Sequence, residues 1–444
     1  ENKKTNYSVT SNTIHSYYAL PVRCISRRST PHVEDLSAFQ TANSYIVPSE
    51  GYYKFKANVR GNGVGRLVSP GSSEFIDVTE GLSTNMSDIV KVDYLWWQEA
   101  GGAAANPVTV PVILDNQGKV DDDGYVMFHI DSYKEGNLII AGYDVDGNIL
   151  WTWHLWLTDE PKQMKSHNFA VMDRFLGATF APEGTTALET DDLLNQTYGF
   201  YYQWGRKDPF AVNSWYKYSG GSWTVGTYVK TNVSAEKTVP NSVSNPMRFH
   251  LGTGTGDTEL PGPSNNNEFG SMSSYNTIEW QCISDYRSDT GENDVRPALW
   301  GYSSASGLGK TTTKTMYDPC PPGYCVAFYT VWTSDDGGSY YTWLDGKYYN
   351  YNTRNNTAEV VAGKGIFVKA DTFDKTWYPF TGYLSGTNMS WYGSGSQGRF
   401  NSSTPVGMGS RSMYYDANSA GQAVNGSSSG VPSSYALPVR CQKQ

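Results

Sequence analysis

The chain has 444 residues, more than one ordinary hydrophobic core needs, so two or three domains are expected. Charged residues make up only 17% and aromatic residues 14%, a composition typical of an extracellular β-rich protein and unlike that of a disordered chain. A net charge of −9 without any run of Lys or Arg argues against nucleic acid as a partner, and no stretch approaches the roughly 20 apolar residues of a transmembrane segment.

The first residues contain a motif that returns at the end of the chain. Residues 18–24 and 435–441 both read YALPVRC, whereas the residues upstream of the two copies share little. A match of this length argues against a chance similarity.

Residues 34–161 read as a series of short β-strands. The stretches SYIVPSEGYYKFKANV, SDIVKVDYLWWQE, GYVMFHI and GNLIIAGYDVDGNILWTWHLWLTD are each bounded by Gly, Pro, Asn or Asp. Short strands separated by turn residues predict a β-sandwich. In the last stretch, Gly147 between Asp146 and Asn148 predicts a tight hairpin turn.

Two features of this segment resemble ligand sites. Asp144, Asp146 and Asn148 suit the first ligands of a calcium loop, but Ile149 stands where an EF-hand needs Gly, and no Glu closes the loop. His154 belongs to the WTWHLW run, whose alternating aromatic residues are typical of a core strand. We therefore expect a turn and a core strand here.

The sequence changes character after residue 161. Long loops rich in Gly and Ser follow, with one helix predicted within residues 185–205, where acidic residues precede Leu193 and Leu194. Residues Gly386–Tyr435 include 13 Ser, 9 Gly, 4 Asn and 4 Tyr but only three charged residues. Antibody loops have this composition, because Tyr supplies rigid contact area while Ser, Gly and Asn adapt their hydrogen bonds.

No pattern in the sequence indicates an enzyme. The six His residues lack metal-ligand spacing, and no HExxH, phosphate-binding loop or GxSxG is present. Cys320 lies among prolines that look structural. We expect no catalytic residue, no metal site and no cofactor.

Five motifs, in one order, carry a resemblance to a known family. VMDRFLGA (171–178), YGFYYQWGRKDPF (198–210), YDPCPPGY (317–324), GRFNSSTP (398–405) and YALPVRC (435–441) together resemble the FISUMP-type domains of bacterial surface proteins. Those domains are similar in fold to C-type lectins and to the formylglycine-generating enzyme. The preceding β-rich segment looks like the sandwich of adhesins at the tips of type V pili.

The resemblance implies a mainly β protein with irregular α+β parts. Residues 34–161 would form an Ig-like β-sandwich, and residues 162–444 a C-type-lectin-like ligand-binding domain. Residues 1–33 resemble the last strand of a second lectin-like domain, or a strand that docks elsewhere as a linker.

The same resemblance bears on the five cysteines. A fold of this type brings its terminal strands together, which implies a disulfide between Cys320 and Cys441. Cys282 and Cys325 then form a second pair or remain two buried thiols. Cys24 should pair with neither Cys320 nor Cys441.

The resemblance also implies a function. It favours a non-enzymatic adhesin on the bacterial cell surface, joined to a pilus subunit or surface scaffold, that binds a host, bacterial or glycan ligand. A phage receptor-binding protein of the same fold, on the virion, is the alternative, and a carbohydrate-active enzyme is a weaker one. The calcium-binding triplets of true C-type lectins are absent, so calcium-dependent sugar binding is not expected.

The terminal segment holds the predicted ligand-binding residues. It resembles the variable proteins of diversity-generating retroelements, in which codons such as those for Asn are rewritten, and Asn401 fits this idea. Interface anchors are usually aromatic residues or Arg, which bury much area per immobilised bond. The candidates are Trp391, Tyr392, Arg399, Tyr414 and Tyr415, with Asn401 and Asn418 adding hydrogen bonds. Trp391, close to Met389, could equally be a core residue.

Overall fold

A computed structural model describes residues 31–444 apart from 69–74, 78, 80, 83–84, 106, 108, 167–168, 212–215, 220–221, 226–238, 251–268, 271–298, 303–312, 329–330, 333–340, 345–346, 351–358, 371–372, 387–390, 394, 407–408, 417–424, 427–430 and 433–434. The first YALPVRC motif, Cys24, Cys282 and Asn418 lie outside the described residues. The chain divides into two compact units, Glu1–His32 and Val33–Gln444. The predicted division at residues 161 and 162 stays a prediction.

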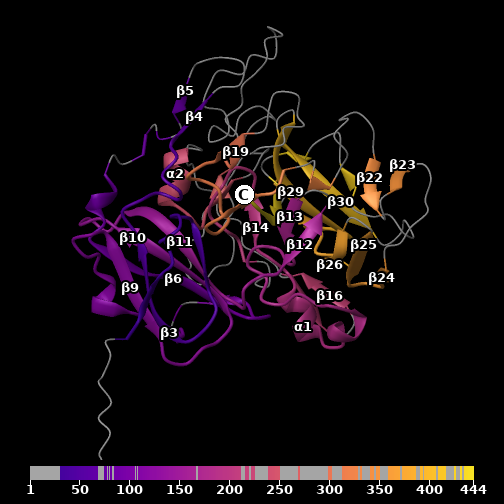
Figure 1. Ribbon diagram of the computed structural model, residues 1–444, viewed down its shortest axis with the longest axis horizontal. Helices are drawn as coiled ribbons and strands as arrows, with labels where there is room; N and C mark the ends of the chain where they lie inside the picture. Colours follow the sequence, from indigo (N-terminus) through magenta and orange to yellow (C-terminus); the bar gives the residue numbers. More distant parts are fainter. Residues whose placement is uncertain are drawn as a thin grey trace, which may run out of the picture. The chain divides into compact units, whose positions relative to one another are not determined.

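The described part of the chain is mainly β, as the sequence predicts (Figure 1). Its helices are short: α1 (Asp191–Gln196), α2 (Val239–Ser244) and the 3-10 turns η1 (Met86–Asp88), η2 (Asp115–Gly118) and η3 (Thr185–Leu188). The predicted helix is confirmed as α1. The side chain of Thr190 caps its N-terminus by accepting a hydrogen bond from the backbone N–H of Leu193 at 3.3 Å.

Two sheets make up the N-terminal part of the second unit. The first has the order β1 (Val33–Asp35), β3 (Gly51–Lys56), β9 (Tyr125–Ile130) and β8 (Val112–Leu114). The second has the order β2 (Ser44–Val47), β11 (Ile149–Leu157), β10 (Gly136–Tyr143), β6 (Lys91–Glu99) and β7 (Ala104–Ala105). A separate hairpin joins β4 (Arg66–Val68) to β5 (Phe75–Asp77).

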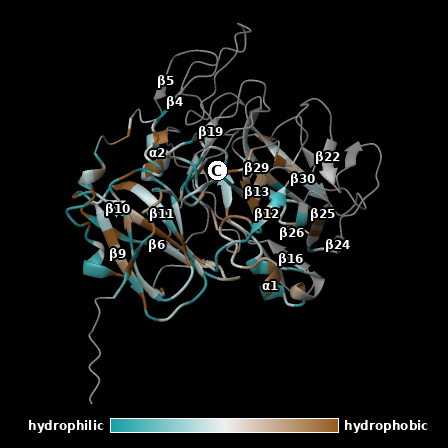
Figure 2. Cartoon of the chain, in the orientation of Figure 1, coloured by the Kyte–Doolittle hydropathy of each residue, from teal (hydrophilic) through white to brown (hydrophobic). Residues whose placement is uncertain are grey.

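These two sheets pack face to face as a β-sandwich. On β3, side chains alternate, so Tyr53 and Phe55 point into the core while Lys54 and Lys56 lie outside against the ring of Tyr125. Figure 2 shows hydrophobic positions along the sandwich strands and hydrophilic ones at the turns. The two sheets therefore share one hydrophobic core, and the Ig-like assignment stays a prediction.

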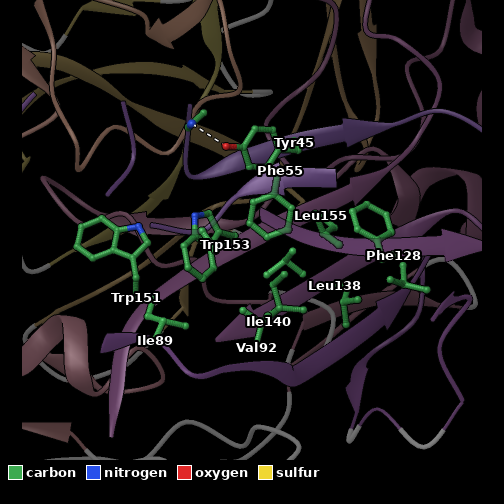
Figure 3. Packing of buried hydrophobic residues seen from close by; sticks show 14 of the residues in the cluster. Tyr45, Phe55, Ile89, Val92, Phe128, Leu138, Ile140, Trp151, Trp153 and Leu155 are labelled. Carbon is green, nitrogen blue, oxygen red and sulfur yellow. Dashed lines mark hydrogen bonds between the residues drawn. The ribbon is translucent and has the colours of Figure 1, made fainter. Parts of the chain in front are cut away.

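The core between the sheets is aromatic (Figure 3). The Phe55 ring of the first sheet lies 5.1 Å from the ring of Tyr45 and 5.4 Å from that of Trp153, both of the second sheet. The hairpin between β10 and β11 has Gly147 at φ +85°, as the DGN sequence predicts. Asp144 closes the turn by accepting a hydrogen bond from the backbone N–H of Asn148 at 2.8 Å.

Strand β11 is buried on both faces. Trp151, Trp153 and Leu155 belong to the sandwich core. Trp156 belongs to a second core, which it shares with residues C-terminal to residue 161, such as Phe200. The WTWHLW run is thus a strand between two cores, which explains its lack of polar alternation.

The remaining strands fall into three larger sheets and several hairpins. A seven-stranded sheet has the order β21 (Tyr324–Val326), β34 (Cys441–Lys443), β13 (Phe169–Met172), β12 (Gln163–Ser166), β26 (Phe373–Pro379), β25 (Gly365–Ala370) and β24 (Glu359–Val361). A second sheet has the order β14 (Tyr201–Gln203), β33 (Ala436–Pro438), β27 (Tyr383–Leu384) and β28 (Trp391–Tyr392). A third joins β29 (Gln397–Val406), β30 (Gly409–Asp416), β31 (Asn425–Gly426) and β32 (Val431–Pro432). The paired short strands are β15 (Tyr216–Ser219) with β16 (Ser222–Val225), β17 (Phe249–His250) with β18 (Phe269–Gly270), β19 (Gly301–Tyr302) with β20 (Thr313–Lys314), and β22 (Tyr341–Leu344) with β23 (Lys347–Asn350).

A disulfide ties the last strand to the DPCPPG corner. It joins Cys320 to Cys441, the pair that the family resemblance implies. Asp318, which is fully buried, accepts hydrogen bonds from the backbone N–H groups of Cys320 and Val326, each at 2.8 Å. The ammonium of Lys314 lies 3.4 Å from the Asp318 carboxylate. Cys325 is buried beside this corner on β21.

Candidate ligand-binding face

The predicted ligand-binding residues come from three strands. Trp391 and Tyr392 form β28, Arg399 and Asn401 lie on β29, and Tyr414 and Tyr415 lie on β30, where Arg399 pairs with Tyr414. A single bridge between Gly382 and Gly398 connects the chain before β27 to β29. The structure thus brings the three strands together, although the sequence separates them.

Close packing at this junction requires a glycine. A Cβ atom on Gly398 would lie 2.1 Å from the ring of Tyr415. A side chain at residue 398 would therefore displace the ring of Tyr415 from its place in the core.

Two of the predicted residues belong to the interior instead of the surface. Tyr415 is 0% exposed, and its hydroxyl donates to the carbonyl of Pro379 at 2.7 Å. Asn401 is 1% exposed, and its amide donates to the carbonyl of Tyr202 at 3.0 Å. Successive residues of a strand point to opposite faces, so Tyr414 and Tyr415 cannot both reach a ligand. We reassign Tyr415 and Asn401 to the core that supports the face.

Trp391 has an intermediate position. Its ring packs edge-on against Tyr201, with centroids 5.1 Å apart and an interplanar angle of 81°. The Trp391 side chain is partly buried, so it mainly packs β28 against Tyr201 and exposes little surface to solvent.

Three tyrosine rings stack across neighbouring strands. Tyr383 of β27 lies 5.5 Å from Tyr392 of β28 and 5.7 Å from Tyr435, which precedes β33, with interplanar angles of 19° and 14°. Such cross-strand aromatic ladders stabilise a sheet and present a regular surface. Tyr392, at the edge strand of this sheet, is 41% exposed.

Arg399 completes this cluster. Its guanidinium carbon lies 4.7 Å from the ring centre of Tyr383 and 5.1 Å from that of Tyr414. Its Nε is buried and has no hydrogen-bond partner among the described residues. Within the same residues, no carboxylate forms an ion pair with it. We call Tyr383, Tyr392, Arg399, Tyr414 and Tyr435 the tyrosine–arginine face.

The environment of Tyr383 is electrostatically mixed. Burial raises the pKa of its hydroxyl, the neighbouring Tyr435 and Tyr392 add to this increase, and the positive charge of Arg399 opposes it. The hydroxyl therefore stays protonated at neutral pH and can donate a hydrogen bond.

Sequence reasoning missed Tyr383 and Tyr435. Tyr435 is part of YALPVRC, which the motif comparison treats as structural, and Tyr383 precedes the Ser- and Gly-rich segment. Both residues belong to the tyrosine–arginine face because β27 and β33, which are distant in sequence, pair with each other. No local pattern indicated that Tyr435 points outward, because Ala436 and Leu437 of the same motif are both fully buried.

Most polar residues of the family motifs have structural roles. The guanidinium of Arg206 donates to the backbone carbonyls of Arg248, Asn245 and Pro246. The ammonium of Lys207 lies 2.6 Å from the carboxylate of Asp208, and both side chains are buried.

His154 is also structural. Its ring nitrogens lie 3.2 Å from the hydroxyl of Ser44 and 2.8 Å from the amide oxygen of Asn137. Burial lowers its pKa to about 3, so the ring is neutral at physiological pH. Among the residues that the structure describes, no group of three or more His, Cys, Asp or Glu side chains is placed to hold a metal ion.

Comparison with known proteins identifies no relative. No family model, no curated protein and no solved structure matches the chain. In the described residues, no helix combines the length and the apolar character needed to cross a membrane.

Proposed function

We propose that this protein is a non-enzymatic adhesin of a bacterial cell surface and that it binds its ligand through the tyrosine–arginine face. The observation that carries the proposal is the gathering of four tyrosines and one arginine from five separate chain segments into one cluster. Tyrosine and arginine are the residues most enriched at binding hot spots. A rigid aromatic ladder costs little conformational entropy on binding.

The proposed fold assignments are an Ig-like sandwich followed by a C-type-lectin-like domain. The two packed sheets of residues 33–157 support the first. The pairing of β33 with β14 and of β34 with β13 supports the second, because the end of the chain returns to the beginning of the predicted domain. The sandwich would join a pilus subunit or surface scaffold, and strand addition is the expected mode.

The adhesin proposal is tested with fluorescently labelled protein and panels of fixed bacterial and mammalian cells. We expect binding to at least one cell type, with loss of binding in the double variant Tyr392→Ala/Tyr414→Ala. Tyr52→Ala is the matched control, since Tyr52 is 39% exposed and stacks on His129 at 5.3 Å on the sandwich. Equal binding by all three proteins, or no cell binding at all, would contradict the proposal.

Assembly separates the adhesin from the phage alternative. An adhesin subunit should sediment as a monomer, whereas a phage fibre protein should form a symmetric oligomer. Sedimentation velocity on the purified chain decides between them.

A further inference from the structure

A buried lysine lies at the centre of the DPCPPGY corner, residues 318–324. Lys314 is only 2% exposed. Its ammonium donates to the backbone carbonyls of Cys320, Pro321 and Tyr324, at 3.1 Å for Pro321 and 2.7 Å for Tyr324. A fourth contact, 3.4 Å long, joins the ammonium to the carboxylate of Asp318. The corner therefore closes around one positive charge.

The sequence of the corner explains why it needs such a charge. Three of its residues are prolines, which have no N–H group, so few backbone donors are available for its carbonyl groups. Lys314 supplies three donors at once. Burial lowers the pKa of Lys314, and the negative charge of Asp318 opposes this decrease. A neutral amine has only two N–H groups, so three carbonyl acceptors favour the ammonium form.

Lys314 is held in place from outside the corner. On β20 it pairs with Gly301 of β19, and its backbone carbonyl accepts a hydrogen bond from the side-chain amide of Asn62 at 2.7 Å. Asn62 lies in the loop between β3 and β4. The backbone N–H of Met316 donates to the carbonyl of Val64 in the same loop at 3.1 Å. None of these contacts involves β34, so the ammonium does not need the last strand to reach its position.

The corner in turn places both partners of the disulfide. Asp318 accepts hydrogen bonds from the backbone N–H groups of Cys320 and Val326, each at 2.8 Å. Val326 lies directly opposite Cys441 where β21 pairs with β34. Because the ammonium of Lys314 contacts both the Asp318 carboxylate and the Cys320 carbonyl, it fixes the segment that carries one sulfur and receives the other.

We propose that Lys314 is a positioning residue for the Cys320–Cys441 disulfide, because its ammonium is the cation around which the DPCPPGY corner forms before the bridge is made. This inference does not depend on the proposed function. In the bridging step the two thiols lose two protons and two electrons, and the disulfide of an oxidant, a small molecule or an oxidoreductase, is reduced to two thiols. Lys314 takes no part in this electron transfer. It raises the rate by holding Cys320 where Cys441 arrives.

The test measures the rate of bridging in the full chain. Reduced, unfolded protein is diluted into oxidised and reduced glutathione, remaining thiols are alkylated at intervals, and peptide mapping quantifies the Cys320–Cys441 pair. We expect Lys314→Ala to form this pair about tenfold more slowly than the wild type, since the carbonyls of the corner lose their donors. Lys207→Ala is the matched control and should bridge at close to the wild-type rate. Lys207 is 4% exposed, and its ammonium lies 2.6 Å from a different buried carboxylate, that of Asp208.

Chemical rescue separates positioning from a general loss of stability. Lys314→Ala removes a propylammonium group from a site lined by three carbonyls and one carboxylate. Added n-propylammonium supplies the same group, so it should restore most of the bridging rate in Lys314→Ala and leave the wild type unchanged. Tetramethylammonium carries the charge but has no N–H donor, and it should restore nothing.

Three outcomes would overturn the inference. Lys314→Ala could form the pair as fast as the wild type, Lys207→Ala could slow it as much as Lys314→Ala does, or the two added cations could act alike. If Lys314→Ala does not fold, the comparison of the two cations within that variant still decides. A bridge that n-propylammonium fails to restore would then exclude the positioning role of Lys314.

Discussion

Tyr414 and Tyr415 are neighbours with opposite environments. Tyr414 lies beside Arg399 and is partly buried, whereas Tyr415 contacts the rings of Tyr378 and Phe380 at 5.7 and 6.1 Å in the core. A change at each position should therefore affect a different property of the protein.

We expect Tyr415→Ala to lower the free energy of unfolding by about 3–5 kcal/mol, because it leaves a cavity and removes the hydrogen bond from the tyrosine hydroxyl to the carbonyl of Pro379. Tyr414→Ala should cost less, about 1 kcal/mol, since the partly buried ring leaves a smaller cavity and its contact with Arg399 is a cation–π interaction. Urea unfolding of both variants provides the measurement. Similar losses in the two variants would contradict this division of roles.

His154 should make stability depend on pH. Burial lowers its folded pKa to about 3, below the ordinary value of 6.5, so the unfolded chain binds a proton that the folded chain does not. The contribution is complete above pH 6.5 and decreases as the pH falls below it, by about 1.4 kcal/mol per pH unit.

His154→Gln removes this titration, so its stability deficit relative to the wild type should shrink between pH 6.5 and pH 4. Urea unfolding of the two proteins at several pH values measures the difference. A deficit that stays constant over this range would show that His154 does not titrate as inferred.

At the scale of elements, the C-terminal strand depends on a long-range crosslink. The disulfide spans a sequence separation of 121 residues, and β34 pairs with both β13 and β21. In the chain-entropy account, closing so long a loop removes much of the freedom of the unfolded chain.

We expect Cys441→Ser to lower the free energy of unfolding by about 3–5 kcal/mol. Adding reductant to the wild type should have the same effect. Non-reducing peptide mapping should recover Cys320 and Cys441 as one linked pair. Recovery of both as alkylated thiols would exclude the bridge.

Within strands β28–β30, we expect positions of the tyrosine–arginine face to tolerate amino-acid substitution better than the buried positions do. If retroelement diversification acts on this segment, sequences from sibling strains should vary at the exposed Tyr392 and the partly buried Tyr414. They should retain Asn401, Tyr415 and Gly398, which the packing requires. Differences scattered evenly between the two groups would end the diversification hypothesis.

Local patterns predicted the elements better than they predicted the face. The strand that contains GYYKFK, the DGN turn and the helix within residues 185–205 depend on neighbours in sequence, and each is present in the structure. The composition of the segment predicts Tyr415 and Asn401 at the surface, because composition says nothing about which face of a strand a residue occupies. Only the strand register separates Tyr414 from Tyr415. Tyr383 could not be found, since its ladder pairs strands far apart along the chain.

At the scale of the whole second unit, the sandwich and the C-terminal part share a buried boundary. Trp96, Ile139 and Trp156 pack in one core with residues such as Met172 and Trp204. Polar contacts cross the same boundary: Asn43 donates to the carbonyl of Asp318 at 2.8 Å and Ser44 to that of Pro319 at 2.6 Å.

We expect residues 33–444 to unfold in a single cooperative transition, because separating the two parts would expose this aromatic core to water. Differential scanning calorimetry is the measurement, with the calorimetric and van't Hoff enthalpies expected to agree. Two well-separated transitions would show instead that the parts are independently stable.

If the protein is the adhesin that we propose, the disulfide has a mechanical consequence. Every residue of the tyrosine–arginine face lies between Cys320 and Cys441 in the sequence, inside a covalently closed ring. The ring connects the face to Cys320 by two routes, one along the chain directly and the other through Cys441 and the disulfide. A pulling force between the ligand and the sandwich divides between these two routes. Shearing β34 out of its sheet therefore leaves both routes joined at Cys320, so the load is still shared between them.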